Sequence, residues 1–164
     1  LASNGEEFDA ITRLTDTVSE FPRIDDRFTG VKNRYGWGLE MDLSRPVELR
    51  SGSATGMLMN CLFLKDFETG EEQHWWCGPT STLQDPCFIP RAKDAPEGDG
   101  WIVQVCNRLD DHATDLLLFD ALDIEKGPIA TIHVPIRLRF GFHGNFATSE
   151  ELGLADPARE LTAA

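Results

Sequence analysis

The chain has 164 residues, which is the length of one ordinary domain. Hydrophobic residues make up 41% of it and charged residues 26%, which excludes a largely disordered chain and allows a real hydrophobic core. The 15 Lys and Arg residues against 28 Asp and Glu residues give a net charge of −13. Because so acidic a surface repels phosphate backbones and anionic lipid, nucleic-acid binding and a polybasic membrane anchor are disfavoured.

No apolar run approaches the roughly 20 residues of a membrane-spanning helix, so we expect no membrane span. The first residues, Leu-Ala-Ser-Asn-Gly-Glu-Glu, lack the basic and apolar pattern of a secretory signal. The four cysteines lie in no C-x-x-C spacing and each has apolar neighbours: Cys61, Cys77, Cys87 and Cys106. These features predict buried free thiols and a cytoplasmic protein.

In chain order, the first predicted element is residues 6–20, where apolar residues at helical spacing indicate a short helix or an irregular segment. Short apolar runs separated by turn residues follow. The predicted strands are residues 34–42, 57–65, 73–77 and 87–89. Residues 67–70 and 97–100 are predicted turns, because their glycines can supply positive φ.

Residues 101–106 and 115–120 form a further predicted hairpin, and 128–134 and 137–140 are two more apolar segments. From residue 149 onward the chain is polar and Ala-rich, which indicates a surface tail or a frayed helix. Successive strands without intervening helices predict an all-β chain built from antiparallel hairpins, as in sandwiches or propeller blades. No exact internal repeat is visible, so the pattern alone does not choose between these two architectures.

Imidazoles can enclose a transition metal, so the four histidines are candidate ligands: His74, His112, His133 and His143. His112 follows two aspartates in a predicted hairpin turn, where we expect an exposed side chain. His74 and His133 lie within predicted strands, where an ordinary packed or surface histidine is the better interpretation. The spacing therefore argues against a site made of all four.

His143 differs because it lies in Gly-Phe-His-Gly, with glycine on both sides and aromatic residues around it. The glycines allow the backbone to bend close to an inward-pointing ring, and Phe140, Phe142 and Phe146 can exclude water. Such surroundings suit a neutral, metal-bound imidazole. From the residues alone, a metal ligand and an ordinary histidine are equally favoured.

Four motifs occur together along the chain: Glu-Phe-Pro-Arg-Ile-Asp (20–25), Asp-Pro-Cys-Phe-Ile-Pro-Arg (85–91), Glu-Gly-Asp-Gly-Trp (97–101) and Gly-Phe-His-Gly (141–144). In these motifs and their order the chain resembles the carotenoid cleavage oxygenase family, over about residues 18–146. Residues 76–81 and 83–87 are most similar to its bacterial lignostilbene dioxygenase branch.

The resemblance implies a seven-bladed β-propeller with antiparallel four-stranded blades and capping loops. Residues 1–164 would be the C-terminal part of this single domain, with residues 147–164 as a polar tail. A non-haem Fe(II) on the propeller axis would be held by four histidines. The N-terminal part of the same propeller would then be the missing partner of this chain, and a homodimer is among the oligomeric states that the sequence leaves open.

By the same resemblance, His143 is the last of the four metal ligands. Glu20 and Glu97 match two of the three glutamates that accept hydrogen bonds from the other ring nitrogens of the ligands. Without the resemblance, Glu97 would be a turn residue and Glu20 a solvated side chain. The remaining ligands and the third glutamate would lie upstream. Gly98 replaces a common aspartate, which we expect to affect the loop and not the iron.

The implied activity is an Fe(II)-dependent dioxygenase that uses O2 to cleave a carbon–carbon double bond of a hydroxylated stilbene into two aldehydes. Cleavage of an apocarotenoid is the alternative, and an apolar tunnel would suit either substrate. No organic cofactor is implied. A different class remains open: taken alone, the chain would be a β-rich binding module without catalysis, because one histidine cannot hold iron usefully.

Overall fold

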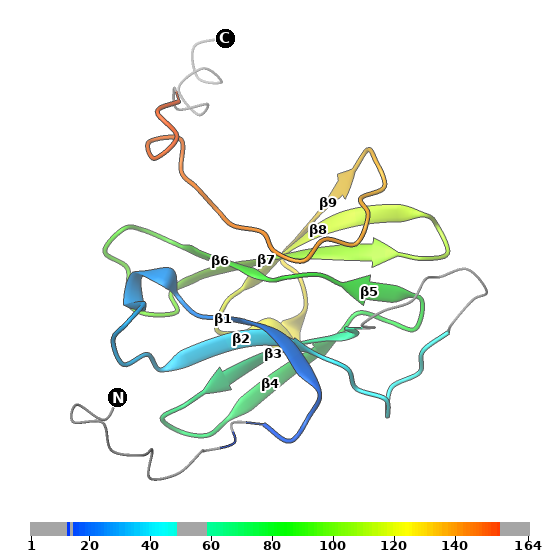
Figure 1. Ribbon diagram of the computed structural model, residues 1–164, viewed down its shortest axis with the longest axis horizontal. Helices are drawn as coiled ribbons and strands as arrows, with labels where there is room; N and C mark the ends of the chain where they lie inside the picture. Colours follow the sequence, from blue (N-terminus) through cyan, green and yellow to red (C-terminus); the bar gives the residue numbers. More distant parts are fainter. Residues whose placement is uncertain (1–12, 14, 49–58, 155–164) are drawn as a thin grey trace, which may run out of the picture.

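The computed structural model describes residue 13 and residues 15–48 and 59–154. These residues form two antiparallel β-sheets that share one hydrophobic core (Figure 1). The antiparallel all-β prediction is therefore confirmed. Among the described residues, no helix is long and apolar enough to cross a membrane.

The first sheet has the strand order β1-β2-β3-β4. Its strands are β1 (Ser19–Arg23), β2 (Tyr35–Glu40), β3 (Cys61–Asp66) and β4 (Glu72–Trp76), and the short 3-10 helix η1 (Asp26–Phe28) follows β1. Gly70 has a φ of 81° in the turn between β3 and β4, as the sequence predicts. Consecutive strands are neighbours, which is the meander expected of linked hairpins.

The second sheet contains β5 (Ser81–Leu83), β6 (Cys87–Pro90), β7 (Gly100–Arg108), β8 (Ala113–Asp120) and β9 (Ala130–Val134), with the 3-10 helix η2 (Ile124–Lys126) between the last two. Both β5 and β6 pair with β7, β5 along residues 106–108 and β6 along residues 100–103. They therefore form one edge of the sheet, interrupted at residues 84–86. Pro86 fits this interruption, because it has no N–H to donate to a ladder.

The core joins the two sheets through aromatic side chains. The Trp37 ring of β2 stacks on Phe88 of β6 at a centroid distance of 5.0 Å, and its Nε1 donates a 2.8 Å hydrogen bond to the carbonyl of Ala121. On the other side, Trp75 meets Phe119 edge to face at 4.9 Å. Aliphatic side chains fill the space between: Leu39, Met59, Leu62, Leu64, Leu83, Ile102, Leu117 and Ile124.

Most predicted strands match the structure to within a few residues, although residues 57–58 lie outside the described residues. The sequence interpretation missed β1 and β5. Of the two alternatives for residues 6–20, the irregular segment fits residues 13 and 15–18, which are not helical, and Ser19 begins β1. Residues 137–140 form no strand, and residues 149–153 form turns. All four cysteines are free, as predicted, with two buried and two half-buried.

Candidate functional site

The segment that carries His143 leaves β9 and crosses the end of the second sheet without joining it (Figure 1). Side chains of that sheet hold its backbone instead. The hydroxyl oxygen of Thr114 accepts a 3.0 Å hydrogen bond from the N–H of Leu138, and Oε1 of Gln84 accepts one of 2.8 Å from Gly141. The apolar residues 137–140 therefore form no ladder, because their partners are side chains and not a neighbouring strand.

The Asp85 carboxylate lies behind the His143 ring. Its side chain is only 5% exposed, and Oδ2 is 3.5 Å from Nδ1 of His143. The same oxygen accepts a 3.2 Å hydrogen bond from the N–H of Gly144 and a 2.8 Å hydrogen bond from Arg23. No hydrogen bond joins the two groups at this separation. A proton on Nδ1 would face the carboxylate, and the Nε2 lone pair would then be free to bind a metal.

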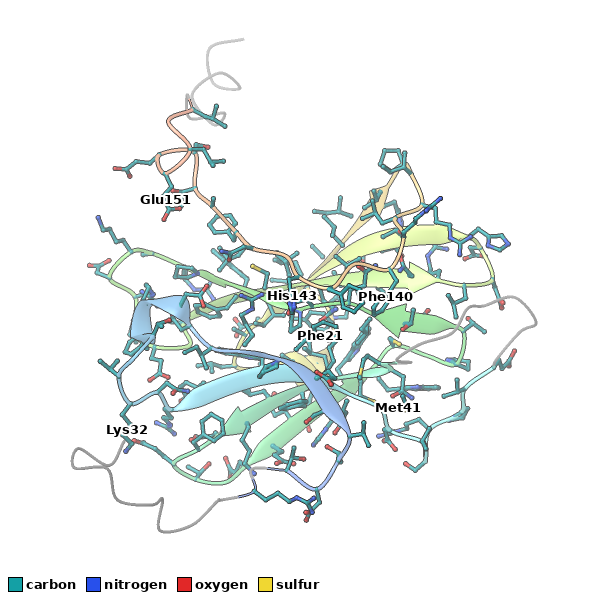
Figure 2. The ribbon with its side chains drawn as sticks, in the orientation of Figure 1. Phe21, Lys32, Met41, Phe140, His143 and Glu151 are labelled. Carbon is teal, nitrogen blue, oxygen red and sulfur yellow. The ribbon has the colours of Figure 1, made fainter. Side chains whose placement is uncertain are left out.

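Phe21 contacts the same imidazole from the first sheet. Its ring meets His143 edge to face, with centroids 5.8 Å apart, and the two labelled side chains lie together in the view of Figure 2. Phe21 has a φ of 55°, which is uncommon for a residue other than glycine. It lies in an irregularity of β1, between Glu20 opposite Leu39 and Arg23 opposite Trp37. A residue held in this backbone conformation often marks a functional site.

The remaining side of His143 is open. Its side chain is 80% exposed, and beside it lies a cavity of about 130 Å³ lined by Gln84, Asp85, Val105 and residues 141–144. Phe140, Phe142 and Phe146 are themselves exposed. The prediction that they exclude water from His143 is therefore wrong for the described chain, because no described residue covers this side of the ring.

The structure places Glu97 and Glu20 away from direct histidine contacts. Oε1 of Glu97 accepts hydrogen bonds from the backbone N–H groups of Arg34 (2.6 Å) and Tyr35 (3.1 Å), at the start of β2. The Glu20 side chain is exposed on β1. Among the described residues, neither carboxylate forms a hydrogen bond or ion pair with a histidine ring. Their roles near a metal stay predictions.

Sequence reasoning missed Asp85 as the partner of His143. The motif at residues 85–91 contains it, but the family resemblance implies only glutamates as partners. The available signal was its position directly before Pro86, at a break between two short apolar runs. Such a break turns a side chain out of the ladder and makes it available to another segment.

The other three histidines have local partners of their own. Nδ1 of His74 is 2.6 Å from Glu40, Nδ1 of His133 is 2.8 Å from Asp115, and His112 is exposed in a turn, as predicted. Burial by itself would raise the pKa of Asp115, but hydrogen bonds from His133 and Arg108 hold that pKa below its usual range.

Across the described ranges, no group of three or more His, Cys, Asp or Glu side chains could hold a metal ion. A metal bound by His143 would therefore need further ligands from outside these residues.

Comparison with protein families gives a match to the family described as Retinal pigment epithelial membrane protein, over residues 1–148. Lignostilbene-alpha,beta-dioxygenase isozyme III of Sphingomonas paucimobilis is 45% identical over 155 residues, covering 94% of this chain and 32% of that protein. Isoeugenol monooxygenase of Pseudomonas nitroreducens is 39% identical over 133 residues, covering 81% and 28%. The chain thus spans less than a third of the length of these relatives.

Solved structures give the same picture. The lignostilbene dioxygenase of Pseudomonas brassicacearum superposes with a TM-score of 0.77 at 37% identity, over 82% of this chain and 28% of that chain. A cobalt-substituted apocarotenoid oxygenase of Synechocystis superposes with a TM-score of 0.69 at 25% identity, over 82% and 26%. The two sheets therefore have the arrangement found in one part of these larger proteins.

Proposed function

The chain belongs to the carotenoid oxygenases, the family of the Retinal pigment epithelial membrane protein, and we propose that residues 1–164 are the C-terminal part of one of its seven-bladed propellers. The full-length protein would be a cytoplasmic Fe(II)-dependent dioxygenase that cleaves the double bond of a hydroxylated stilbene into two aldehydes. The contact between Asp85 and His143 carries this proposal. It places a carboxylate oxygen 3.5 Å from Nδ1 of an imidazole whose side chain is 80% exposed.

The residues present fit one quarter of a four-histidine iron site. His143 would bind the metal through Nε2, while Asp85 keeps the proton on Nδ1 and fixes the ring orientation. Bound Fe(II) would supply an open coordination position for O2 next to the alkene. Three further histidines would come from the remainder of the propeller. Glu20 and Glu97 are proposed as partners of those histidines.

The open side of His143 is where the rest of the site would assemble. The exposed rings of Phe140 and Phe142 border that side and would contribute to an apolar wall once the remaining blades cover them. The chain is more similar in sequence to the lignostilbene dioxygenases than to the apocarotenoid oxygenase. This difference favours a stilbene as the substrate, and an apocarotenoid is the alternative.

The direct test supplies purified full-length protein with Fe(II) and O2, and offers 4-hydroxystilbene and an apocarotenoid in parallel. We expect two aromatic aldehydes from the stilbene and slow or no cleavage of the apocarotenoid. Cleavage of the apocarotenoid alone would overturn the stilbene assignment in favour of the alternative. Stoichiometric iron without cleavage of either compound would overturn the proposed reaction.

Iron content and alkene cleavage of the isolated 164-residue chain distinguish a propeller fragment from a unit that is catalytic by itself. Because no group of three or more His, Cys, Asp or Glu side chains among the described residues could hold a metal ion, we expect this chain to purify without stoichiometric iron and without alkene cleavage. Stoichiometric iron together with cleavage by the 164-residue chain would contradict the proposal that it is part of a larger catalytic unit.

A further inference from the structure

We propose that Arg23 is a positioning residue for His143, acting through Asp85 and through the backbone of residue 144. This inference rests on the proposed role of His143 as a metal ligand and adds a residue of the first sheet to that site. Arg23 lies at the end of β1, on the opposite sheet from the strands that flank Asp85. Its side chain is 17% exposed, so it is largely enclosed by the groups it contacts.

The Arg23 guanidinium donates hydrogen bonds to three residues of the site, two of them adjacent in the chain and the third far from them in sequence. Nη2 donates 2.8 Å hydrogen bonds both to Oδ2 of Asp85 and to the carbonyl of Gly144, and Nε donates a 3.0 Å hydrogen bond to the carbonyl of Pro86. One side chain thus joins the break in the β5–β6 edge to the residue that follows His143. A second carboxylate, Asp26, lies 4.0 Å from Nη1.

This arrangement fixes the oxygen that faces the imidazole. Oδ2 of Asp85 is the atom closest to Nδ1 of His143, and it is also the atom that Arg23 and the Gly144 N–H hold. Rotation of the carboxylate away from the ring would break both of these hydrogen bonds. Because hydrogen bonds between charged groups are the strong ones, Arg23 restricts Asp85 to the orientation that serves His143.

Lysine could replace only part of these contacts. The planar guanidinium presents several N–H donors in a fixed geometry, whereas an ammonium group is a single point charge on a flexible stem. The irregularity of β1 also places Arg23. Residues 20 and 23 of β1 lie opposite residues 39 and 37 of β2, so three steps along β1 match only two steps along β2. The same irregularity delivers the Phe21 ring and the Arg23 guanidinium to the His143 segment from one strand.

The test measures Fe(II) affinity of the full-length protein under anaerobic conditions, for wild type, Arg23→Met, Arg23→Lys and His143→Ala. Arg108→Met is the matched control, because Arg108 also binds a buried carboxylate, Asp115, at 2.8 Å without any hydrogen bond to the His143 segment among the described residues. Loss of a side chain that orients a metal ligand costs 10- to 100-fold in metal affinity, so we expect a loss of about 10-fold or more for Arg23→Met. Arg23→Lys should recover part of it, and Arg108→Met should bind like wild type.

A second readout separates positioning from folding. The visible spectrum of the Co(II)-substituted protein reports ligand geometry, so we expect an altered spectrum for Arg23→Met and an unaltered one for Arg108→Met at matched metal occupancy. In a double-mutant cycle with Asp85→Asn, the loss of affinity should be less than additive, because both residues act on one contact.

Wild-type affinity in Arg23→Met, equal losses in both arginine variants, or additive losses in the cycle would each overturn the role of Arg23. Retention of iron by His143→Ala would overturn the proposed metal site itself, so the two failures are distinguishable.

Discussion

Oε1 of Gln84 accepts a 2.8 Å hydrogen bond from the backbone N–H of Gly141, and a Cβ added at position 141 would lie 3.1 Å from the same oxygen. The glycine two residues before His143 therefore serves close approach to a side chain, since its φ is not in the left-handed region. A side chain at position 141 would require this oxygen to move by a few tenths of an ångström.

Replacing Gln84 with Met should loosen the His143 segment while leaving the sheets intact. The N–H of Gly141 would lose its acceptor, and a typical hydrogen bond contributes about 1 kcal/mol. We expect roughly 5-fold faster amide hydrogen exchange at residue 141 in the full-length protein, and no change along β8. Unchanged exchange at residue 141 would show that Gln84 does not hold this segment.

We expect Trp37 to make the largest single contribution to the packing between the two sheets. Trp37→Ala removes the stack on Phe88 and the hydrogen bond to the Ala121 carbonyl. Truncation of a buried tryptophan costs about 3–5 kcal/mol, so the melting temperature should fall by several degrees. Leu43→Ala is the control, because Leu43 is 78% exposed, and a similar fall in both variants would contradict this account.

Because of its buried thiol groups, we expect the protein to lose folding stability at alkaline pH. Burial is the main cause that raises the pKa of Cys61 to about 12, from an ordinary value of 9.0. The unfolded chain therefore releases this proton first as the pH rises above about 9, and the free energy of unfolding falls between about pH 9 and pH 12. Below about pH 9 this contribution is fully present.

The measurement is the melting temperature between pH 8 and pH 11, for wild type and Cys61→Ala. The alanine variant should show a shallower decline over this range, because it lacks the thiol that titrates. Parallel declines in the two proteins would show that Cys61 contributes nothing to the alkaline destabilisation.

Two substitutions of Glu97 distinguish two roles for its carboxylate: holding the backbone at the start of β2, and orienting a metal-binding histidine. Glu97→Gln keeps an oxygen that can accept the N–H groups of Arg34 and Tyr35, whereas Glu97→Ala leaves both without their acceptor. If Glu97 also orients a histidine of the remaining propeller, Glu97→Gln should lower Fe(II) affinity 10- to 100-fold, since such partners contribute that much.

Both variants are compared by Fe(II) affinity and by melting temperature. We expect Glu97→Ala to lower both quantities and Glu97→Gln to lower the affinity alone. Wild-type affinity in Glu97→Gln would restrict Glu97 to its backbone role in the turn.

Most strands could be predicted because their residues alternate regularly between the two faces of the sheet. The strands that were missed lack this regular alternation. β7 alternates between buried and half-buried residues along most of its length, which is the pattern that sequence reasoning recognises. β1 contains Pro22 and a left-handed residue at Phe21, and β5 has only three residues. Neither offers enough alternation to identify a strand, because the signal depends on several consecutive positions.

The candidate site was predictable in part. Gly-Phe-His-Gly identified His143, but its partner depended on which segments meet in space. Asp85 and His143 are 58 positions apart, and only the break between β5 and β6 brings this carboxylate to the ring. Arg23 is more distant still, and its contacts depend on an irregular strand of the other sheet. Long-range contacts made at irregular positions leave no periodic signal in the sequence.

The most direct test of the central claim is the iron content of the purified full-length protein after His143→Ala and after His112→Ala. His112 is an exposed turn residue outside the site, so its loss should leave iron binding intact. We expect stoichiometric iron in wild type and His112→Ala, and no retained iron in His143→Ala. Equal iron content in the two variants would contradict the assignment of His143 as a metal ligand.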